Sequence, residues 1–303
     1  LSTGKRHLQP APWQIAEKGD SSQQMEVAMK NAGRMMGVVS AALLLTGTSL
    51  CGRSHATEQR YPVYQLQTAP DLKAEVYEEA VWQNIPWATG FYKLSTARKV
   101  TLQTHFKIGF TAEALYFLVK CEEPDMAKIK ADGKDGNPAL WREDSIEVFV
   151  HPKDTEHVLQ VLTNAGGDHS NMLNELDVYN ATDLSKSATG AFQGNDEYHV
   201  SVMIPFRSLR DTAPADGEAW RFNVLRNRMI NGADGEDRLS TFSRLFRSSL
   251  EPDNYQELVF HHRPATEEDG KLLYDNPAQD EDAGVHQIVN LSFNEGGGDI
   301  ANA

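Results

Sequence analysis

The residues best suited to chemistry are a tryptophan and a glutamate six positions apart, Trp141 and Glu147. Glu147 lies in the run Ser145–Val150, which is typical of a β-strand, and alternate residues of a strand share one face. If strand geometry extends back to residue 141, one face offers both an indole and a carboxylate. The other face of this strand carries the residues expected in the core: Ile146, Val148 and Val150. An indole can stack on the C–H face of a sugar ring, while a carboxylate accepts two hydrogen bonds from adjacent hydroxyls. The alternative is that Trp141 closes one end of the core and that Glu147 is a solvated strand residue.

Three carboxylates in this segment, Glu143, Asp144 and Glu147, raise the question of glycoside hydrolysis. That reaction needs two carboxyl groups flanking the scissile bond at a fixed separation. Glu143 and Glu147 share a face, so spacing alone does not exclude it. However, the remaining sequence has no Gly-rich phosphate loop, nucleophile elbow or Cys/His metal motif, and it leaves no separate catalytic module. We therefore expect that the protein is not an enzyme.

The elements that must position these residues are short strands separated by turns. Seven runs have strand composition and are bounded by Gly, Pro, Asn or Asp: 100–106, 115–121, 145–150, 157–163, 198–204, 220–225 and 258–261. Helical signals are limited to 75–82 and 207–210. This pattern predicts an all-β fold, an antiparallel β-sandwich or jelly roll of immunoglobulin-like type. Trp82 and Trp220 lie among apolar residues and are expected in its core.

The N-terminal part resembles an export signal. Lys30 and Arg34 form a positive region, 35–50 is apolar, and Ala56 ends a run of residues suited to signal peptidase. The apolar run is too short for a comfortable transmembrane helix. We expect a periplasmic or secreted protein. Acylation at Cys51 is the less favoured alternative, since Leu rather than a small residue precedes it.

These features predict three regions: a leader and signal peptide at 1–56, a sandwich domain at 57–262, and an acidic, flexible tail at 263–303. The tail is acidic and Gly-rich, and it cannot bury enough apolar surface to offset the cost of ordering. One interpretation makes this tail a contact for a protein partner. Within the sandwich, Cys121 is expected to be a buried, inert thiol.

The formal net charge of −14 and the isoelectric point near 5.1 limit the class of ligand. Nucleic acids and anionic lipids bind clustered Lys and Arg side chains, so an acidic protein is poorly suited to them. Neutral ligands and cations remain, and sugars are the obvious neutral class.

Six segments in order resemble the carbohydrate-binding module family 9 domains, which are DOMON-like β-sandwiches. They are Glu79–Gln83, Leu115–Asp125, Trp141–Val150, Tyr198–Leu209, Trp220–Arg226 and Pro252–Phe260. The resemblance covers most of residues 65–261. It implies an exported, non-catalytic protein that binds a saccharide and supports polysaccharide degradation, or a module of a glycoside hydrolase system with catalysis elsewhere.

In that family a sugar lies between two aromatic rings and receives hydrogen bonds from acidic, amide and guanidinium groups. The motif match assigns carbohydrate binding to Trp141, Glu147, Asn223 and Arg226. Asn223 and Arg226 have opposite parity, so they cannot both face one site without a bulge or a strand end. The second ring is left open, and the candidates are Trp87, Tyr179 and Phe242.

The resemblance also brings two cofactors into consideration, calcium and a b-type heme. Domains of this family often hold structural calcium, and Asp132, Asp135 and Asn137 form an oxygen-rich loop that could bind it or could be an ordinary turn. Some related sandwiches hold a b-type heme for electron transfer. The available heme ligands would be Met172, Met203, Met229 and Lys120, although Met in a β-core is usually packing. Histidines such as His105, His157 and His199 show no metal-ligand spacing.

Overall fold

The computed structural model describes residues 60–73, 80–96, 98–173, 187–210, 212–231 and 237–276, with the backbone alone at 178–179. These residues belong to one compact unit that begins at residue 55. The predicted leader and signal peptide, and residues 277–303 of the predicted tail, lie outside the described residues.

The described chain is nearly all β-structure, which confirms the predicted fold class. The strands are β1 (Tyr61–Gln65), β2 (Trp87–Thr89), β3 (Tyr92–Lys93), β4 (Thr104–Phe110), β5 (Ala114–Glu122), β6 (Ser145–His151), β7 (Leu159–Asn164), β8 (His169–Leu173), β9 (Val178–Tyr179), β10 (Ala188–Gln193), β11 (Glu197–Pro205), β12 (Ala219–Asn227), β13 (Leu239–Thr241), β14 (Gln256–His261) and β15 (Leu273–Asp275). The helical pieces are η2 (Ala80–Trp82), η3 (Met126–Lys128), η4 (Leu140–Arg142), η6 (Phe206–Ser208), η7 (Pro252–Asn254) and α2 (Glu267–Gly270). No helix of the described part is long and apolar enough to cross a membrane.

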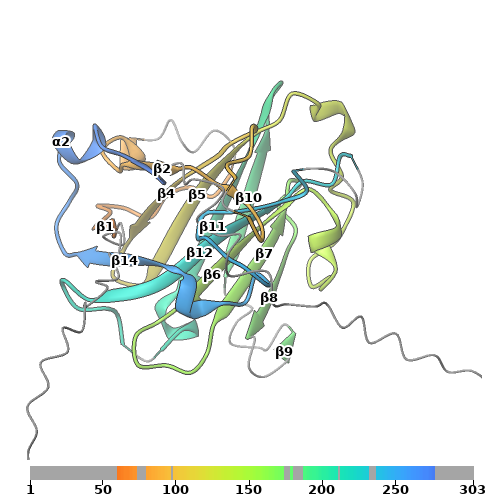
Figure 1. Ribbon diagram of the computed structural model, residues 1–303. Coiled ribbons are helices and arrows are strands. Elements are labelled where there is room, and N and C mark those ends of the chain that lie inside the picture. Colours follow the sequence, from red (N-terminus) through yellow and green to blue (C-terminus); the bar gives the residue numbers. More distant parts are fainter. Residues whose placement is uncertain are drawn as a thin grey trace, which may run out of the picture. The chain divides into compact units, whose positions relative to one another are not determined.

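The strands form two layers that are joined along one edge (Figure 1). The order is β10-β11-β5-β4-β1-β14-β12-β6-β7-β8-β9. Most neighbours are antiparallel, but β1 runs parallel to both β4 and β14, so the sandwich is not purely antiparallel. On the other edge, Thr189 on β10 donates to the carbonyl of Gly167 at 2.7 Å, and Gln193 donates to that of Ala165 at 2.9 Å. The sheet is therefore nearly closed.

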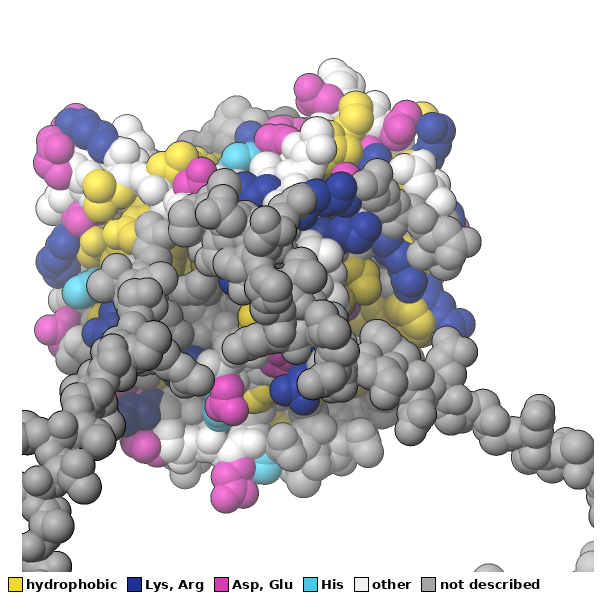
Figure 2. All heavy atoms as spheres, in the orientation of Figure 1, with side chains coloured by type: hydrophobic (Ala, Val, Ile, Leu, Met, Phe, Trp, Pro, Cys, Tyr) yellow, Lys and Arg dark blue, Asp and Glu magenta, His cyan; other side chains and the backbone are white. Residues whose placement is uncertain are grey.

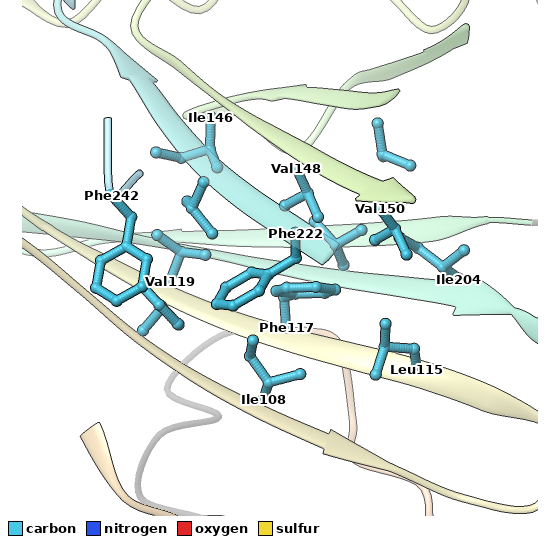
Figure 3. Packing of buried hydrophobic residues seen from close by; sticks show 14 of the residues in the cluster. Ile108, Leu115, Phe117, Val119, Ile146, Val148, Val150, Ile204, Phe222 and Phe242 are labelled. Atoms are coloured by element: carbon cyan, nitrogen blue, oxygen red, sulfur yellow. The ribbon is translucent and has the colours of Figure 1, made fainter. Parts of the chain in front are cut away.

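The main core lies between the two layers. Ile108, Phe117 and Val119 of β4 and β5 face the apolar residues of β6 and β12 (Figure 3). The β6 members are those with the predicted inward parity: Ile146, Val148 and Val150, all fully buried. Each buried side chain of this size contributes about 1.5–3 kcal/mol relative to an exposed one. Because these residues fix which face of β6 is inside, they also fix which face carries Glu147.

Both tryptophans expected in the core are there, each about 1% exposed. Trp220 packs against Phe260 at 4.9 Å between ring centroids, and Trp82 belongs to a smaller cluster on the outer face of β4 and β5. Cys121 is a buried free thiol, as predicted. The strand predicted at 100–106 begins later, at Thr104. Just before it, the Gln103 side chain accepts from the Phe91 N–H at 2.9 Å and donates to the Val100 carbonyl at 2.6 Å.

The folded domain extends beyond the predicted boundary at residue 262. After β14 the chain forms α2, which Thr266 caps, and then β15, which pairs in parallel with β2. Asn276 is buried and donates to the carbonyls of Gly90 and Phe242 at 3.2 and 2.7 Å. Gly90 has φ of +89°, and a Cβ there would lie 2.6 Å from the Asn276 nitrogen, so only glycine fits. Acidic composition alone did not indicate that residues 263–276 dock on the sandwich.

Candidate functional site

One cleft of the described chain is lined by the exposed indole of Trp141 and by polar side chains that include Glu147. Its volume is about 370 Å³ and it opens on the outer face of β6, β7 and β12. The lining residues are Leu94, Trp141, Glu147, Gln160, Met172, Leu225, Asn227, Arg238, Leu239, Ser249 and Leu250. The size is within the range of small-ligand pockets, about 300–1,000 Å³. Trp141 and Glu147 therefore line the same cleft.

Glu147 forms the polar floor of this cleft. It is only 6% exposed, and two amide groups donate to it. Asn227 Nδ2 lies 2.7 Å from Oε1, and Gln160 Nε2 donates to Oε2. Burial raises the pKa of this carboxyl above its ordinary value, while the two amide hydrogen bonds act in the opposite direction. The amides orient the carboxylate, and each oxygen retains a lone pair for a ligand hydroxyl.

Trp141 reaches the cleft from a 3-10 turn rather than from the strand. The side chain of Asn137 accepts from the Ala139 N–H at 2.9 Å and starts the turn, which becomes η4. Leu140 is fully buried and anchors η4 in the interior, so the next side chain, Trp141, points outward and is 38% exposed. The expected extension of strand geometry back to residue 141 is therefore wrong, although the indole and the carboxylate still share a cleft.

Asn223 lies outside the cleft. It is on the outer face of β12 but is completely buried, because the segment after β13 crosses over it. Its Oδ1 accepts from Thr241 Oγ1 at 3.0 Å and from the Ser243 N–H at 2.8 Å. The role that this geometry supports is to hold the 241–243 segment, from which the chain continues to Ser249 and Leu250 on the cleft wall.

Arg226 also lies outside the cleft, on the inner face of the sheet. It is 1% exposed, donates to Glu123 Oε2 at 3.1 Å, and its guanidinium lies 5.6 Å from the Tyr198 ring. Glu123 is fully buried and also pairs with Arg228 at 2.7 Å. Arg226 thus belongs to a buried ion-pair network. The assignment of Arg226 to direct ligand contact is corrected, because its parity with Phe222 and Val224 directs it inward.

No second aromatic ring lines the cleft among the described side chains. Trp87 lies on β2 with the Lys107 ammonium 4.7 Å from its ring, and Phe242 packs in the core 4.7 Å from Phe106. Tyr179 pairs through its backbone with Met172, and its side chain lies outside the described part. The apolar surface near Trp141 is instead aliphatic and thioether: Leu94, Met172, Leu225, Leu239 and Leu250.

The three carboxylates considered for hydrolysis do not surround a common space. Glu143 accepts from Asn164 at 2.9 Å, and Asp144 is fully buried. The Asp144 oxygens accept from the backbone N–H groups of Lys130 and Met229 at 2.9 and 2.8 Å. Of the three, Glu147 alone lines the cleft. Glu143 and Asp144 hold neighbouring segments in place, so the geometry gives no pair of carboxyls flanking a bond.

The loop that contains Asp132, Asp135 and Asn137 does not form a calcium site. Asp135 Oδ1 accepts from the His169 N–H at 2.9 Å and lies 3.1 Å from its ring nitrogen. No group of three or more acidic, histidine or cysteine side chains that could hold a metal occurs in the part of the chain that the structure describes, Asp132 included. These residues do not fit calcium, which takes six to eight oxygens. The loop behaves as a turn against β8.

The residues considered as heme ligands are on four different segments. Lys120 of β5 is paired with Glu197 at 3.3 Å, Met172 of β8 lines the cleft, and Met203 lies on β11 opposite Tyr116. Met229 is buried just after β12. This arrangement gives the heme alternative no support.

Sequence reasoning missed four polar residues of the cleft: Gln160, Asn227, Arg238 and Ser249. A signal existed for two of them. Gln160 is the polar residue inside the apolar run at 157–163, and Asn227 has the parity opposite to the inward-facing Val224 and Arg226. Arg238 had no such signal, because its place depends on the loop that returns from β12 to β13.

A profile of the carbohydrate family 9 binding domain-like family matches residues 74–244. The chain belongs to this family. The match spans η4, β6, β7 and β12, which carry the main residues of the cleft. The family assignment confirms the resemblance that the six sequence segments indicated.

Three solved structures are similar to the chain. A provisionally assigned carbohydrate-binding protein from Bacteroides uniformis has a TM-score of 0.53 at 14% identity, covering 67% of this chain and 99% of that one. A family 9 carbohydrate-binding module from Caldicellulosiruptor kristjanssonii in complex with glucose has a TM-score of 0.48 at 17% identity, covering 69% and 98%. A module from the same organism in complex with cellotriose has a TM-score of 0.47 at 18% identity, covering 72% and 100%. At these identities the first similarity shows the fold alone. No curated protein matches the chain.

Proposed function

We propose that the protein is a non-catalytic carbohydrate-binding module that holds a saccharide in the cleft of Trp141 and Glu147. The observation that carries the proposal is that these two side chains, from η4 and β6, line one cleft in a member of the family 9 binding domains. An exposed indole beside an oriented carboxylate suits a ligand with both an apolar face and hydroxyl groups.

In the proposed complex a pyranose ring stacks on Trp141 and its hydroxyls donate to Glu147. Asn227 and Gln160 hold the carboxylate, so little side-chain entropy is lost when the sugar binds. Oriented acceptors at the floor and an apolar wall above them are the usual composition of a small-ligand site. The module provides binding and no chemical step, so we place it in support of polysaccharide degradation by other proteins.

Isothermal titration against mono- and oligosaccharides, including glucose and cellotriose, tests this function. We expect saturable binding by the folded protein and its loss in Trp141→Ala. The matched control is Phe246→Ala, since Phe246 is also 38% exposed but does not line the cleft. Binding that survives Trp141→Ala unchanged, or the absence of binding across a broad glycan panel, contradicts the proposal.

We further propose that the protein is exported, with residues 30–56 acting as the signal. The support is the basic, apolar and small-residue order of this segment. Intact mass of the mature protein from the native host tests it. A mature N-terminus at Thr57 is expected. A retained N-terminal region argues against export, and a diacylglycerol adduct on Cys51 argues for the lipoprotein alternative.

A further inference from the structure

Three leucines form one side of the cleft, next to its polar floor. They are Leu94, Leu225 and Leu239, which all line the cleft and together are named the leucine patch. Leu225 lies on β12, Leu239 begins β13, and Leu94 directly follows β3. The Leu94 N–H donates to the Leu239 carbonyl at 3.0 Å, so the backbone joins these two residues. Three separate segments of the chain thus bring the leucines together.

The leucine patch is held by a small core cluster on the outer side of the sheet. Leu225 belongs to this cluster, is almost fully buried and forms the base of the patch. Leu94 and Leu239 are half-buried and pack against the same cluster. Hydrophobic side chains reach the surface elsewhere on the domain as well (Figure 2), so exposure alone does not mark a ligand site. What distinguishes the leucine patch is its position beside hydrogen-bonding groups.

Sheet register places the leucine patch directly against the polar floor. Leu225 on β12 is opposite Glu147 on β6, and Leu239 on β13 is opposite Asn227 on β12. Directly opposed residues of antiparallel strands share a face, and their Cβ atoms lie about 4.5–5.5 Å apart. The Asn227 amide is one of the two groups that donate to Glu147, at 2.7 Å. A sugar whose hydroxyls donate to Glu147 therefore has a neighbouring ring substituent beside the leucines.

A surface of leucine side chains distinguishes a methyl substituent from one that ends in a hydroxyl. A methyl group gains free energy when leucine side chains remove it from water. A hydroxyl loses its water there, and leucine side chains offer no hydrogen bond in return. The indole of Trp141 stacks on the C–H face, which both kinds of sugar share. Five of the six apolar residues described in the lining are aliphatic or thioether, so most of the apolar surface suits a methyl group rather than a flat ring face.

We propose that the cleft selects a saccharide that carries a methyl group, either a 6-deoxy sugar or an acetylated sugar. Its hydroxyls donate to Glu147, its C–H face stacks on Trp141, and its methyl group packs on the leucine patch. This inference rests on the proposed function and names the ligand class of the same site. The two amide donors that orient Glu147 fix the ring relative to the leucines, so one substituent of the ring is read by the patch.

The test compares matched sugars that differ at one substituent. Glucose, galactose and mannose are each titrated into the full chain, beside the 6-deoxy form and the 2-acetamido-2-deoxy form of the same sugar. We expect one methyl-bearing form to bind roughly tenfold more tightly than its parent sugar, because its methyl group is buried and the corresponding hydroxyl no longer has to lose its water. The arm that shows the preference identifies the methyl group as that of a deoxy sugar or that of an acetyl group.

Polar substitutions in the leucine patch locate the effect. Leu239→Asn replaces an apolar side chain with an amide, and it should bring the ratio of methyl-bearing to parent affinity close to one. Leu94→Asn should also lower this ratio. The matched control is Leu272→Asn, since Leu272 is 48% exposed and does not line the cleft, and it should keep the wild-type ratio. If Leu239→Asn does not fold, Leu94→Asn and nuclear Overhauser effects from the ligand methyl to leucine methyl groups of the wild-type protein decide the matter.

The outcomes separate the two proposals. If the parent sugars bind, lose affinity in Trp141→Ala and bind at least as tightly as their methyl-bearing forms, the methyl preference is overturned and the carbohydrate function stands. Tighter binding of the parent sugars would mean that a polar residue of the lining, such as Arg238 or Ser249, bonds the extra hydroxyl. If Leu272→Asn lowers the ratio as much as Leu239→Asn does, the assignment to the leucine patch is overturned. If no sugar of either kind binds, the carbohydrate function itself fails and the preference fails with it.

Discussion

Asn227 and Glu147 lie 80 residues apart in the chain and are joined by a 2.7 Å hydrogen bond from Nδ2 to Oε1. The bond crosses between β12 and β6, and the same amide lies 3.1 Å from Ser145 Oγ. Ladder register places Asn227 opposite Ser145, which brings its side chain diagonally to Glu147. The sheet therefore builds the floor of the cleft before any ligand arrives.

Replacing Asn227 should weaken both the fold and the binding of sugar. In Asn227→Ala the buried carboxylate of Glu147 loses one of two amide donors, which costs about 1–3 kcal/mol of unfolding free energy. Urea denaturation measures this loss, and titration of the folded variant should show weaker saccharide binding. The matched control is Asn254→Ala, which removes an equivalent 2.7 Å Asn–Glu bond at an exposed site. An equal stability loss in both variants contradicts the assignment.

Alanine substitutions of Trp141 and Trp82 should affect different properties: the first should weaken binding and the second should weaken the fold. Trp141→Ala is expected to cost about 2 kcal/mol or more of binding free energy, because a stacked aromatic anchor is lost. It should leave the melting temperature nearly unchanged, since the ring is 38% exposed. Trp82→Ala should do the opposite and cost about 3–5 kcal/mol of stability, since that ring is buried. A large loss of stability in Trp141→Ala would mean that the indole supports the core.

Sugar binding should depend on pH through Glu147. Burial raises the pKa of this carboxyl above its ordinary 4.5, so it protonates at a higher pH than an exposed glutamate. As pH falls through the raised pKa, the charged acceptor is lost and affinity for a neutral sugar decreases. Titrations at several pH values test this, with Glu147→Gln as the control that removes the dependence. A flat wild-type profile from neutral pH down to pH 4.5 contradicts the role of the carboxylate.

The Glu147 carboxyl also makes the unfolding free energy depend on pH, in the direction opposite to its effect on sugar binding. Because the folded state binds the proton more tightly than the unfolded state, the unfolding free energy decreases as pH rises from 4.5 through the folded pKa. The cost of the buried charge is complete above the folded pKa. Glu147→Gln should therefore be more stable relative to wild type at neutral pH than at pH 4.5. Denaturant curves at the two pH values measure the difference.

The fold could be predicted from sequence because its signals are local. Alternation in Ser145–Val150 fixed the inner face of β6, and turn residues marked the strand ends. The site was only partly predictable, because the position of Arg238 in the cleft depends on how the chain returns from β12 to β13, for which the sequence has no local signal. Arg226 shows the limit of motif matching. It belongs to a matching strand, but its parity gave the correct indication that it points inward with Val224.

The network around Glu123 should prove structural. Glu123→Gln leaves Arg226 and Arg228 buried without their carboxylate, and breaking such a pair typically costs about 3–5 kcal/mol. Arg226→Met removes one charge but keeps apolar volume, and Glu123 retains Arg228, so we expect a smaller loss. Urea denaturation compares the unfolding free energies of the two variants. Folded Arg226→Met should bind saccharide as wild type does. A loss of affinity without a loss of stability would mean that Arg226 contacts the ligand.

The end of the folded domain can be tested by truncation. A chain ending at Asn276 keeps all the contacts described for this region and serves as the reference. A chain ending at His262 loses β15, α2 and two buried hydrogen bonds from Asn276, and also the 2.7 Å bond from Tyr64 to Asp269. At about 1 kcal/mol for each hydrogen bond, the expected loss is about 3 kcal/mol before apolar burial is added. Asn276→Ala in the full chain should account for part of this loss. Equal melting temperatures for the two truncated chains would mean that residues 263–276 rest on the sandwich without stabilising it.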